Sequence, residues 1–399
     1  DGLFLPLSMQ SNTTARPLVK AGDRVLKGQL VAASSASMAA HIHAPTSGKV
    51  LAIEDHVVPH PSGLKAFTLV IECDGDDRWA DPPVATDPFK LDPEELANRV
   101  ENAGIVGMGG AIFPASTKLR QGRRFEIATL LINGGECEPY LTTDDRLMRE
   151  RAKEIIDGAR LVQYIIESYR VVIAIEDNKP EAIAALKNVS ELYGSLEIVT
   201  VPTLYPMGSA KQMIQAITGQ EVPAGARSND IGVLVHNVGT IHAIQQALRY
   251  GRPLISRVVT VAGSCVSKPR NVEALIGTPV SHLLKVCGGL KQEPAQLLMG
   301  GPMMGLVLPS VDVPLLKGSN GVLALSKQEV NARQTAPCIR CGRCVQACPM
   351  GLLPLEMAKF TRSDNLDGAN NAGLRDCILC GSCAYVCPSH IPLVQYFEY

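Results

Sequence analysis

The chain has 399 residues, with 38 Lys and Arg against 39 Asp and Glu and a formal net charge of −1. This length predicts about two to four domains, and the balanced charge excludes the basic footprint typical of nucleic-acid-binding proteins. No uninterrupted apolar run reaches the ~18 residues of a membrane-spanning helix. We therefore expect no such helix, although the chain can still lie on a membrane surface.

Cysteines outside the C-terminal region follow no pairing pattern. They are Cys73, Cys137, Cys265 and Cys287, and their scatter suits a reducing compartment. The chain starts at Asp1 without a signal peptide. Residues 397–399 carry no stop signal, so we expect the chain to be trimmed at both ends.

Residues 1–85 alternate short β-rich runs with turns, which predicts a β-rich domain. The runs 19–23, 27–31 and 43–50 resemble a biotinyl/lipoyl-type barrel-sandwich domain. In that family the carrier lysine lies seven residues before the Ala of an Ala-Pro pair, and Ser37 stands there in this chain. The resemblance therefore implies a scaffold without a swinging arm. The proline-rich stretch 81–93 is predicted to be a linker.

Residues 90–252 alternate helical and extended patterns, which predicts an α/β domain. Asp92 is expected to cap a helix that has Pro93 in its first turn. The predicted strands cover 127–132, 171–176, 196–201 and 232–236. The predicted helices cover about 143–168 and 240–250, with further helix starts at Pro114, Pro180 and 207–209.

Residues 255–325 look like a small β-rich module. Its sequences at 258–263, 277–280 and 299–305 are similar to the soluble-ligand-binding β-grasp found beside flavin domains. A structural role is expected for it.

A glycine-rich loop precedes the helix start at Pro114. Gly107, Gly109 and Gly110 let the backbone come close to a ligand, and the helix start directs free N–H groups at an anion. Positive charge follows within a few turns. These features favour a phosphate-bearing cofactor, although a structural turn and a solvated basic face remain the alternatives. The sequence is neither a Rossmann fingerprint nor a P-loop. The basic side chains are those of Lys118, Arg120, Arg123 and Arg124.

The segment 331–399 repeats the spacing C-x2-C-x2-C-x3-C-P. This is the spacing of bacterial ferredoxins with two [4Fe–4S] clusters, in which the fourth cysteine of each run ligates the other cluster. Zinc sites or disulfides are the alternatives. Six Lys and Arg meet five Asp and Glu in this segment, so no field that steers a partner is expected. The predicted ligand sets are Cys338, Cys341, Cys344 and Cys387 for one cluster, and Cys377, Cys380, Cys383 and Cys348 for the other.

The order of motifs along the chain resembles the FMN- and NADH-binding subunit of respiratory complex I. These motifs are G-x-G-G-A-x-F-P-x-x-x-K at 107–118, N-x-x-E-x-E-P at 133–139, a glycine turn at 208 and the segment 236–240. Segments 136–148, 175–180 and 391–397 make the chain more similar to the C subunit of the Rnf-type (Rsx-type) ion-translocating electron-transport complex. This resemblance covers nearly the whole chain.

The resemblance implies a set of cofactor-binding residues. Phe113 and Glu138 would face the nicotinamide nucleotide. Ile112 replaces a glycine common in complex I, and Ser209 and Ala210 replace an acidic pair. FMN binding is expected to tolerate these changes better than NADH binding. FMN would be held by Gly107, Gly109, Gly110, Lys118, Asn133, Glu136, Gly208, Asn237 and Thr240.

The resemblance also implies a function. The chain would be a peripheral subunit on the cytoplasmic face of the bacterial inner membrane, passing electrons between NAD(H) and ferredoxin through FMN and two [4Fe–4S] clusters. Other subunits of the complex, one of them an iron–sulfur ferredoxin-like subunit, would be its partners and would couple this transfer to ion movement. A cobalamin reductase of microcompartments and a non-catalytic electron conduit are the alternatives.

Overall fold

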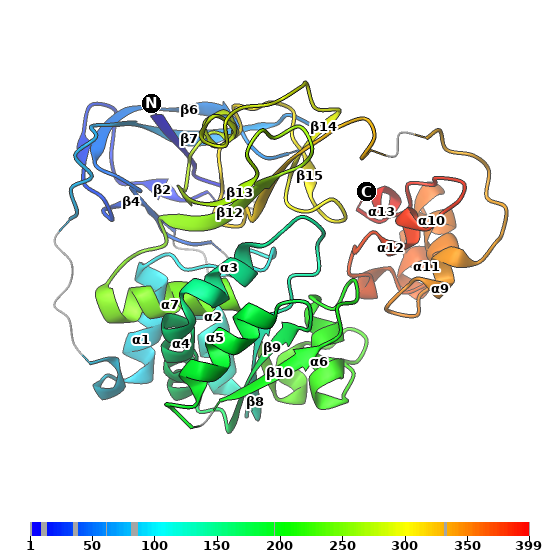
Figure 1. Cartoon of the computed structure of the whole chain (residues 1–399), viewed down its shortest axis with the longest axis horizontal. Helices are drawn as coiled ribbons and strands as arrows, with labels where there is room; N and C mark the ends of the chain where they lie inside the picture. Colours follow the sequence, from blue (N-terminus) through cyan, green and yellow to red (C-terminus); the bar gives the residue numbers. More distant parts are fainter. Residues whose placement is uncertain are drawn as a thin grey trace.

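The computed structural model describes residues 2–8, 14–34, 39–60, 62–80, 87–194, 196–330 and 333–398. Two β-rich parts lie side by side above an α/β part, and a small helical part stands to one side of all three (Figure 1). No helix within these ranges is long and apolar enough to cross a membrane.

The N-terminal part forms two small sheets. Alternate residues of its strands are buried, and Leu5, Val31, Val50 and Leu69 lie in its core. Ser37 and residues 81–86 lie outside the described residues. One sheet has the order β1 (Gly2–Pro6), β7 (Lys65–Cys73), β6 (Gly48–Val57), β3 (Arg24–Val25), and the other β2 (Arg16–Pro17), β4 (Leu30–Ala33), β5 (Ile42–His43).

The α/β part is built on a parallel sheet with the order β10-β9-β8-β11. Its strands are β8 (Thr129–Gly134), β9 (Arg170–Glu176), β10 (Glu197–Val201) and β11 (Val233–Asn237). Residues of β8 alternate between two cores: Leu130 and Ile132 pack with the longer helices, whereas Leu131 packs with the helix that follows β10. Both faces of the sheet are therefore covered, as parallel strands require.

The helices of this part begin close to the predicted positions. The expected single helix 143–168 is instead two helices, because Arg151 leaves helical geometry with φ −126° and ψ 31°. Both pack on the helices that follow β9 and β11, and the first also contacts the β-rich module. The helices are η1 (Pro88–Lys90), α1 (Pro93–Asn102), α2 (Ala115–Arg124), α3 (Thr143–Glu150), α4 (Ala152–Ile166), α5 (Pro180–Ser190), α6 (Ala210–Thr218), η2 (Ser228–Ile231) and α7 (Val238–Tyr250).

The β-rich module has one mixed sheet with the order β13-β12-β16-β14-β15, in which β12 and β16 are parallel. It docks on the N-terminal part, where Phe4 N donates to Gly277 O at 2.9 Å. Its elements are β12 (Ser256–Ala262), β13 (Arg270–Leu275), α8 (Val280–Val286), β14 (Gln296–Met299), β15 (Leu306–Val307) and β16 (Gly321–Leu325).

The C-terminal part is helical and packs around its own small core, which includes Leu393 and Val394. It lies beside the α/β part on the side of α6 (Figure 1). Its elements are α9 (Arg343–Gln346), α10 (Pro354–Arg362), α11 (Leu366–Asn371), η3 (Leu374–Asp376), α12 (Ser382–Tyr385) and α13 (Leu393–Glu398).

Candidate cofactor sites

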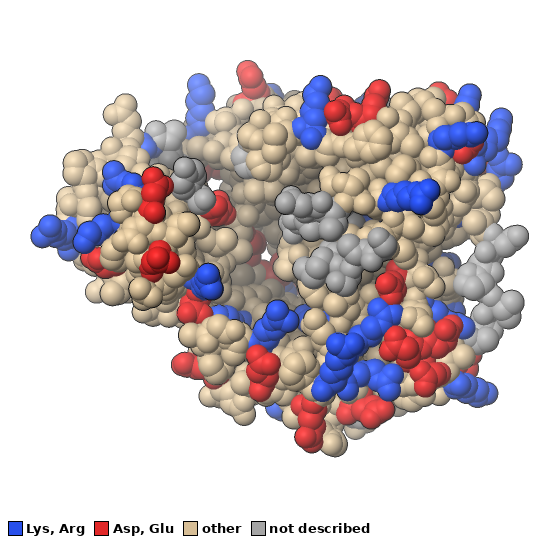
Figure 2. All heavy atoms as spheres, turned by 180° about the vertical axis from the view of Figure 1, so that it is seen from behind, with Lys and Arg blue, Asp and Glu red and all other residues tan. Residues whose placement is uncertain are grey.

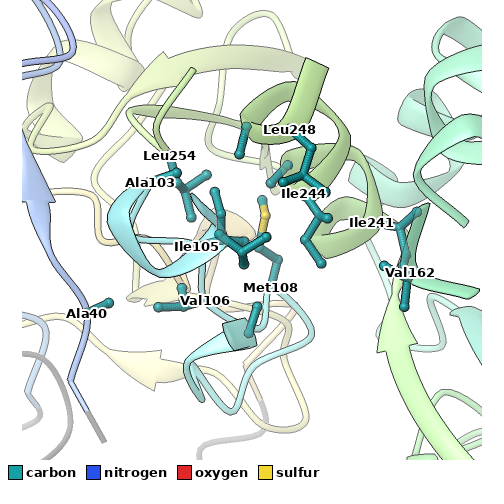
Figure 3. Packing of buried hydrophobic residues seen from close by; sticks show 14 of the residues in the cluster. Ala40, Ala103, Ile105, Val106, Met108, Val162, Ile241, Ile244, Leu248 and Leu254 are labelled. Carbon is teal, nitrogen blue, oxygen red and sulfur yellow. The ribbon is translucent and has the colours of Figure 1, made fainter. Parts of the chain in front are cut away.

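The glycine-rich loop is anchored from behind by buried apolar side chains. Ile105, Val106 and Met108 lie against Ile244 and its neighbours on α7 (Figure 3). Met108 N also donates to Thr240 Oγ1 at 2.9 Å, and this hydroxyl is fully buried. These contacts fix the position of the loop relative to α7 just before its glycines.

The loop has a left-handed backbone at positions 110 and 112 and little room for a side chain at position 109. Gly110 has φ +107°, a conformation that side chains rarely allow. A Cβ at Gly109 would lie 3.3 Å from Asn237 Cβ, so only a small group fits there. Ile112 also has a positive φ, +49°, which is unusual for a β-branched residue, and its side chain lies against Gly318 of the β-rich module. The position where relatives of complex I carry glycine thus keeps a left-handed backbone.

Lys118 is the one member of the predicted basic run that turns toward the strand ends. Its ammonium group donates to Val235 O, and burial lowers its pKa to about 8. Arg120 instead pairs with Glu94 and Glu101 on α1. Arg123 and Arg124 are exposed in the last turn of α2. The expectation that all four residues supply charge to the loop is therefore too broad, because the helix distributes them over several faces.

Asn133 and Gly208 bring β8 and the start of α6 together. Asn133 Nδ2 donates to Gly208 O at 2.8 Å, and Asn133 Oδ1 accepts from Gly135 N at 2.8 Å. A Cβ at Gly208 would lie 2.4 Å from Gly135 O. Glycine is thus required at 208 by this close backbone approach.

Glu136 accepts hydrogen bonds from the first turn of α3, and Asn237 accepts one from the first turn of α7. Both residues also form a hydrogen bond with Asp144. Glu136 Oε1 accepts from Thr143 Oγ1 at 2.8 Å and from Asp144 N at 3.1 Å. Asn237 Oδ1 accepts from Gly239 N at 2.8 Å, while its Nδ2 donates to Asp144 Oδ2 at 2.6 Å. Burial, reinforced by the charge of Glu136, raises the pKa of Asp144 to about 7. The sequence reasoning assigned no role to Asp144, although its place in the first turn after the N-x-x-E-x-E-P motif could have suggested one.

Glu138 faces the β-rich module. Its two carboxylate oxygens accept from Met303 N at 3.0 Å and Met304 N at 2.7 Å, and burial raises its pKa. Phe113 O, in the glycine loop, accepts from Gly107 N at 2.8 Å. The predicted contact of Phe113 and Glu138 with a nucleotide stays a prediction.

The predicted FMN residues therefore gather at the carboxyl ends of β8 and β11, where parallel sheets bind their ligands. Gly109, Asn237 and Thr240 lie on one side, and Asn133, Glu136 and Gly208 on the other. The glycine loop, the ammonium group of Lys118 and the two asparagine side chains form a donor set that fits a phosphate and a polar ring.

The eight C-terminal cysteines form two groups around two small cavities, and none forms a disulfide. Cys387 joins the first three cysteines and Cys348 joins the last three, which is the grouping that exchange of the fourth ligand requires. Burial is the main cause that raises the pKa of Cys344 and Cys377, and each also responds to a thiol of the opposite run. Four sulfur atoms around one cavity fit a cubane cluster. The outer quartet is Cys338, Cys341, Cys344 and Cys387, and the inner quartet is Cys348, Cys377, Cys380 and Cys383.

Four family models match successive parts of the chain. The Nuo51 FMN-binding domain matches residues 100–246, and the 4Fe-4S dicluster domain matches 337–391. The RnfC barrel sandwich hybrid domain matches 1–76, and the SLBB domain matches 258–307. The N-terminal barrel sandwich, the SLBB module and the cluster domain are thereby confirmed as parts of a mixed α/β protein.

Curated relatives extend over the whole chain. The C subunit of the ion-translocating oxidoreductase complex of Rhodobacter capsulatus is 51% identical over 396 residues, which are 99% of this chain and 76% of the relative. The protein of the same name from Yersinia pestis is 48% identical over 398 residues, all of this chain and 64% of the relative. This chain thus spans between about two thirds and three quarters of these relatives.

A solved structure shares the fold at low sequence identity. The NAD+-reducing [NiFe]-hydrogenase in its H2-reduced state aligns with a TM-score of 0.54 and 18% identity, over 79% of this chain and 63% of that one. The matches to the FMN-binding and 4Fe-4S dicluster families show that the cofactors of this chain are FMN and two [4Fe–4S] clusters. The chain is therefore an electron-transport flavoprotein.

Proposed function

This chain belongs to the family of C subunits of ion-translocating oxidoreductase complexes, and we propose that it transfers electrons between NAD(H) and ferredoxin through FMN and two [4Fe–4S] clusters. Other subunits of the membrane complex, including an iron–sulfur ferredoxin-like subunit, couple this transfer to ion translocation. The chain sits peripherally on the cytoplasmic face of the bacterial inner membrane.

One observation carries this proposal: the inner quartet abuts the loops beside the predicted flavin site. The Tyr205 hydroxyl donates to Cys380 O, and Gln212 Nε2 donates to Pro349 O at 3.2 Å. Tyr205 and Gln212 flank Gly208, which packs on Gly135. The segment 205–212 thus contacts both the predicted flavin site and the inner quartet. The two sites are therefore neighbours, as electron transfer between them requires.

Each part of the chain has a role in this function. Residues 1–85 are a scaffold, residues 90–252 a Rossmann-like FMN- and NADH-binding domain, residues 255–325 a β-grasp module and residues 331–399 the cluster domain. FMN supplies the conversion between two-electron and one-electron transfer. The amides of the loop 107–110 and Lys118 hold its phosphate, and the carboxyl-end residues of β8 and β11 hold its ring.

The nicotinamide nucleotide is held by Phe113 and Glu138. Each carboxylate oxygen of Glu138 accepts from one amide, of Met303 or Met304, so the nucleotide would use a remaining lone pair or replace one of these amides by rearrangement. That rearrangement would open the contact between the α/β part and the β-rich module beside the flavin. If Glu138 serves only to hold these two amides, the chain is an electron conduit, and this is the second candidate function.

Anaerobic isolation followed by stopped-flow mixing with NADH tests the proposal. Isolated protein should contain one FMN and roughly eight iron atoms, as two [4Fe–4S] clusters require. After stopped-flow mixing, NADH should bleach the flavin absorbance. A protein with full flavin and iron that NADH fails to bleach, while dithionite does, would establish the conduit role instead.

A further inference from the structure

The inner quartet is joined to the rest of the molecule. Besides the contacts of Tyr205 and Gln212, Asp376 beside Cys377 lies 3.6 Å from Lys211 Nζ. A Cβ at Gly381 would lie 2.9 Å from Met303 O, and Met303 is the residue whose amide holds Glu138. The inner cluster therefore has protein on its flavin side and is screened from an external partner there.

The outer quartet is open to solvent. Cys338 and Cys341 are exposed, whereas Cys380 and Cys383 of the inner quartet are buried. Ile339, between the two exposed cysteines, is 67% exposed, and residues 333–341 are all exposed. A partner can thus reach the outer cluster directly.

The charge around the outer quartet is one-sided. Residues 333–355 contain Arg333, Arg340 and Arg343 and no Asp or Glu. All three arginines are exposed, and neither Arg340 nor Arg343 takes part in an ion pair within the described residues. Seen from behind, the cluster domain carries Lys and Arg side chains at its outer edge, with Asp and Glu side chains close to them (Figure 2). Over the whole segment 331–399 the positive and negative side chains nearly balance, which is why no steering field was expected. The excess of positive charge is confined to residues 333–343.

Backbone geometry keeps Arg340 beside the outer quartet. Arg340 N lies 3.3 Å from Cys338 Sγ and donates to it, and Arg340 has φ +57°. The first acidic residue after this stretch, Glu356, lies 3.9 Å from Lys359 Nζ, and Asp376 is paired with Lys211 on the flavin-facing side.

From these observations we propose that the outer quartet is the exchange point of the chain, and that the basic surface formed by residues 333–343 docks a redox protein with a negatively charged surface around its own centre. This inference rests on the proposed function. Clusters bound at the two quartets would carry one electron per event, which the inner cluster would lose to the outer cluster and the outer cluster to the centre of the partner. No bond or proton is transferred in these steps, and two events remove the two electrons that FMN releases.

Binding of two protein probes to the anaerobic holoprotein tests the docking surface without NADH. An acidic two-cluster ferredoxin should bind at low salt and lose affinity as salt rises, whereas a basic cytochrome c should bind weakly under all conditions. The double substitution Arg340→Gln and Arg343→Gln should weaken ferredoxin binding by roughly three- to thirtyfold at low salt, as the loss of two exposed charge pairs implies.

Arg375→Gln is the control, compared with each single change Arg340→Gln and Arg343→Gln, because it removes one positive charge from an exposed residue beside the inner quartet. It should leave ferredoxin affinity unchanged. Equal weakening by Arg375→Gln and by the single changes, or no weakening by the double change, overturns the docking surface. The arginines would then serve only to compensate the negative charge of the cluster, and the double variant would show a lowered outer-cluster potential with unaltered binding.

The order of the clusters has its own test. The Cys341→Ser protein is partly reduced with dithionite and freed of it by anaerobic gel filtration before ferredoxin is added. The flavin should still exchange electrons with the remaining cluster, whereas ferredoxin reduction should be lost. If Cys341→Ser keeps ferredoxin reduction, the exchange point lies elsewhere. Since dithionite supplies the electrons, failure of the NADH reaction does not affect this result.

Discussion

At the scale of single residues, Asp144 is the group whose environment departs most clearly from that of a surface carboxyl. Its side chain accepts from Asn237 beside the capping carboxylate of Glu136. Burial and that neighbouring charge raise its pKa from 3.8 to about 7. The folded protein therefore binds a proton that the unfolded chain releases between about pH 4 and pH 7.

The sign of the resulting pH dependence follows from linkage. Because the folded state binds more protons in this window, the contribution of Asp144 to stability falls as pH rises from about 4 to 7 and is constant above it. Asp144→Asn keeps an oxygen that accepts from Asn237 and removes the charge. We expect this variant to unfold about 2 °C or more above the wild type at pH 8, and to match it at pH 4. Thermal unfolding across the pH range measures this, and an equal difference at both pH values would contradict it.

Gly109 tests the flavin site directly. A Cβ at this position lies 3.3 Å from Asn237 Cβ, so Gly109→Ala fits after a small shift whereas Gly109→Val does not. Gly109→Val should therefore lose most of its FMN and keep its iron, and Gly109→Ala should keep much of both. The flavin-to-iron ratio of the isolated proteins measures this. A Gly109→Val protein with its full flavin content would show that the loop does not approach the cofactor.

At the scale of elements, the sequence predicts what depends on local chemistry. The four strands of the parallel sheet and the helix starts at Pro93 and Pro180 follow from hydrophobic runs and capping residues. The break at Arg151 could not be predicted, because the residues on both sides are good helix formers and only α3 makes the additional contact with the distant β-rich module. The roles of Arg120 and Glu138 were likewise hidden, since Glu94 and Met303 approach them only in the folded chain.

The geometry of the two cysteine runs determines which cysteines bind which cluster. Pro349 and Pro388 follow the last cysteine of each run and fix the direction in which the chain leaves the cluster. The structure places Cys348 in the inner quartet. Cys348→Ser should therefore damage the inner cluster, and Cys341→Ser the outer one, each with loss of iron or conversion to a three-iron form because serine is a poorer ligand. EPR spectra of the single variants distinguish the clusters. If both changes disturb the same cluster and spare the other, each run binds its own cluster.

At the scale of the whole molecule, one lysine connects three of the four parts. Lys317 belongs to the β-rich module, and its Nζ donates to His41 O of the N-terminal part and to Gly104 O of the α/β part, each at 2.7 Å. The side chain is 3% exposed, and burial lowers its pKa to about 7. Gly104, with φ +63°, has no room for a Cβ because His41 O would lie 2.4 Å from it. The arrangement of these parts around the flavin site therefore depends on this junction.

Replacement of Lys317 by methionine keeps the apolar stem and removes the donor. The carbonyl oxygens of His41 and Gly104 would then be buried without their partner, which costs roughly 2–4 kcal/mol in the free energy of unfolding. The pH dependence should change as well. Between about pH 7 and 10.5 the unfolded chain holds a proton on Lys317 that the folded chain lacks, so this lysine makes stability rise with pH, and Lys317→Met should lose that part of the rise. Denaturant unfolding at pH 7 and pH 9 measures both effects, with Lys291→Met, an exposed position in the same module, as the control. A Lys317→Met protein as stable as this control at both pH values would mean that the three parts are held together by their apolar contacts alone.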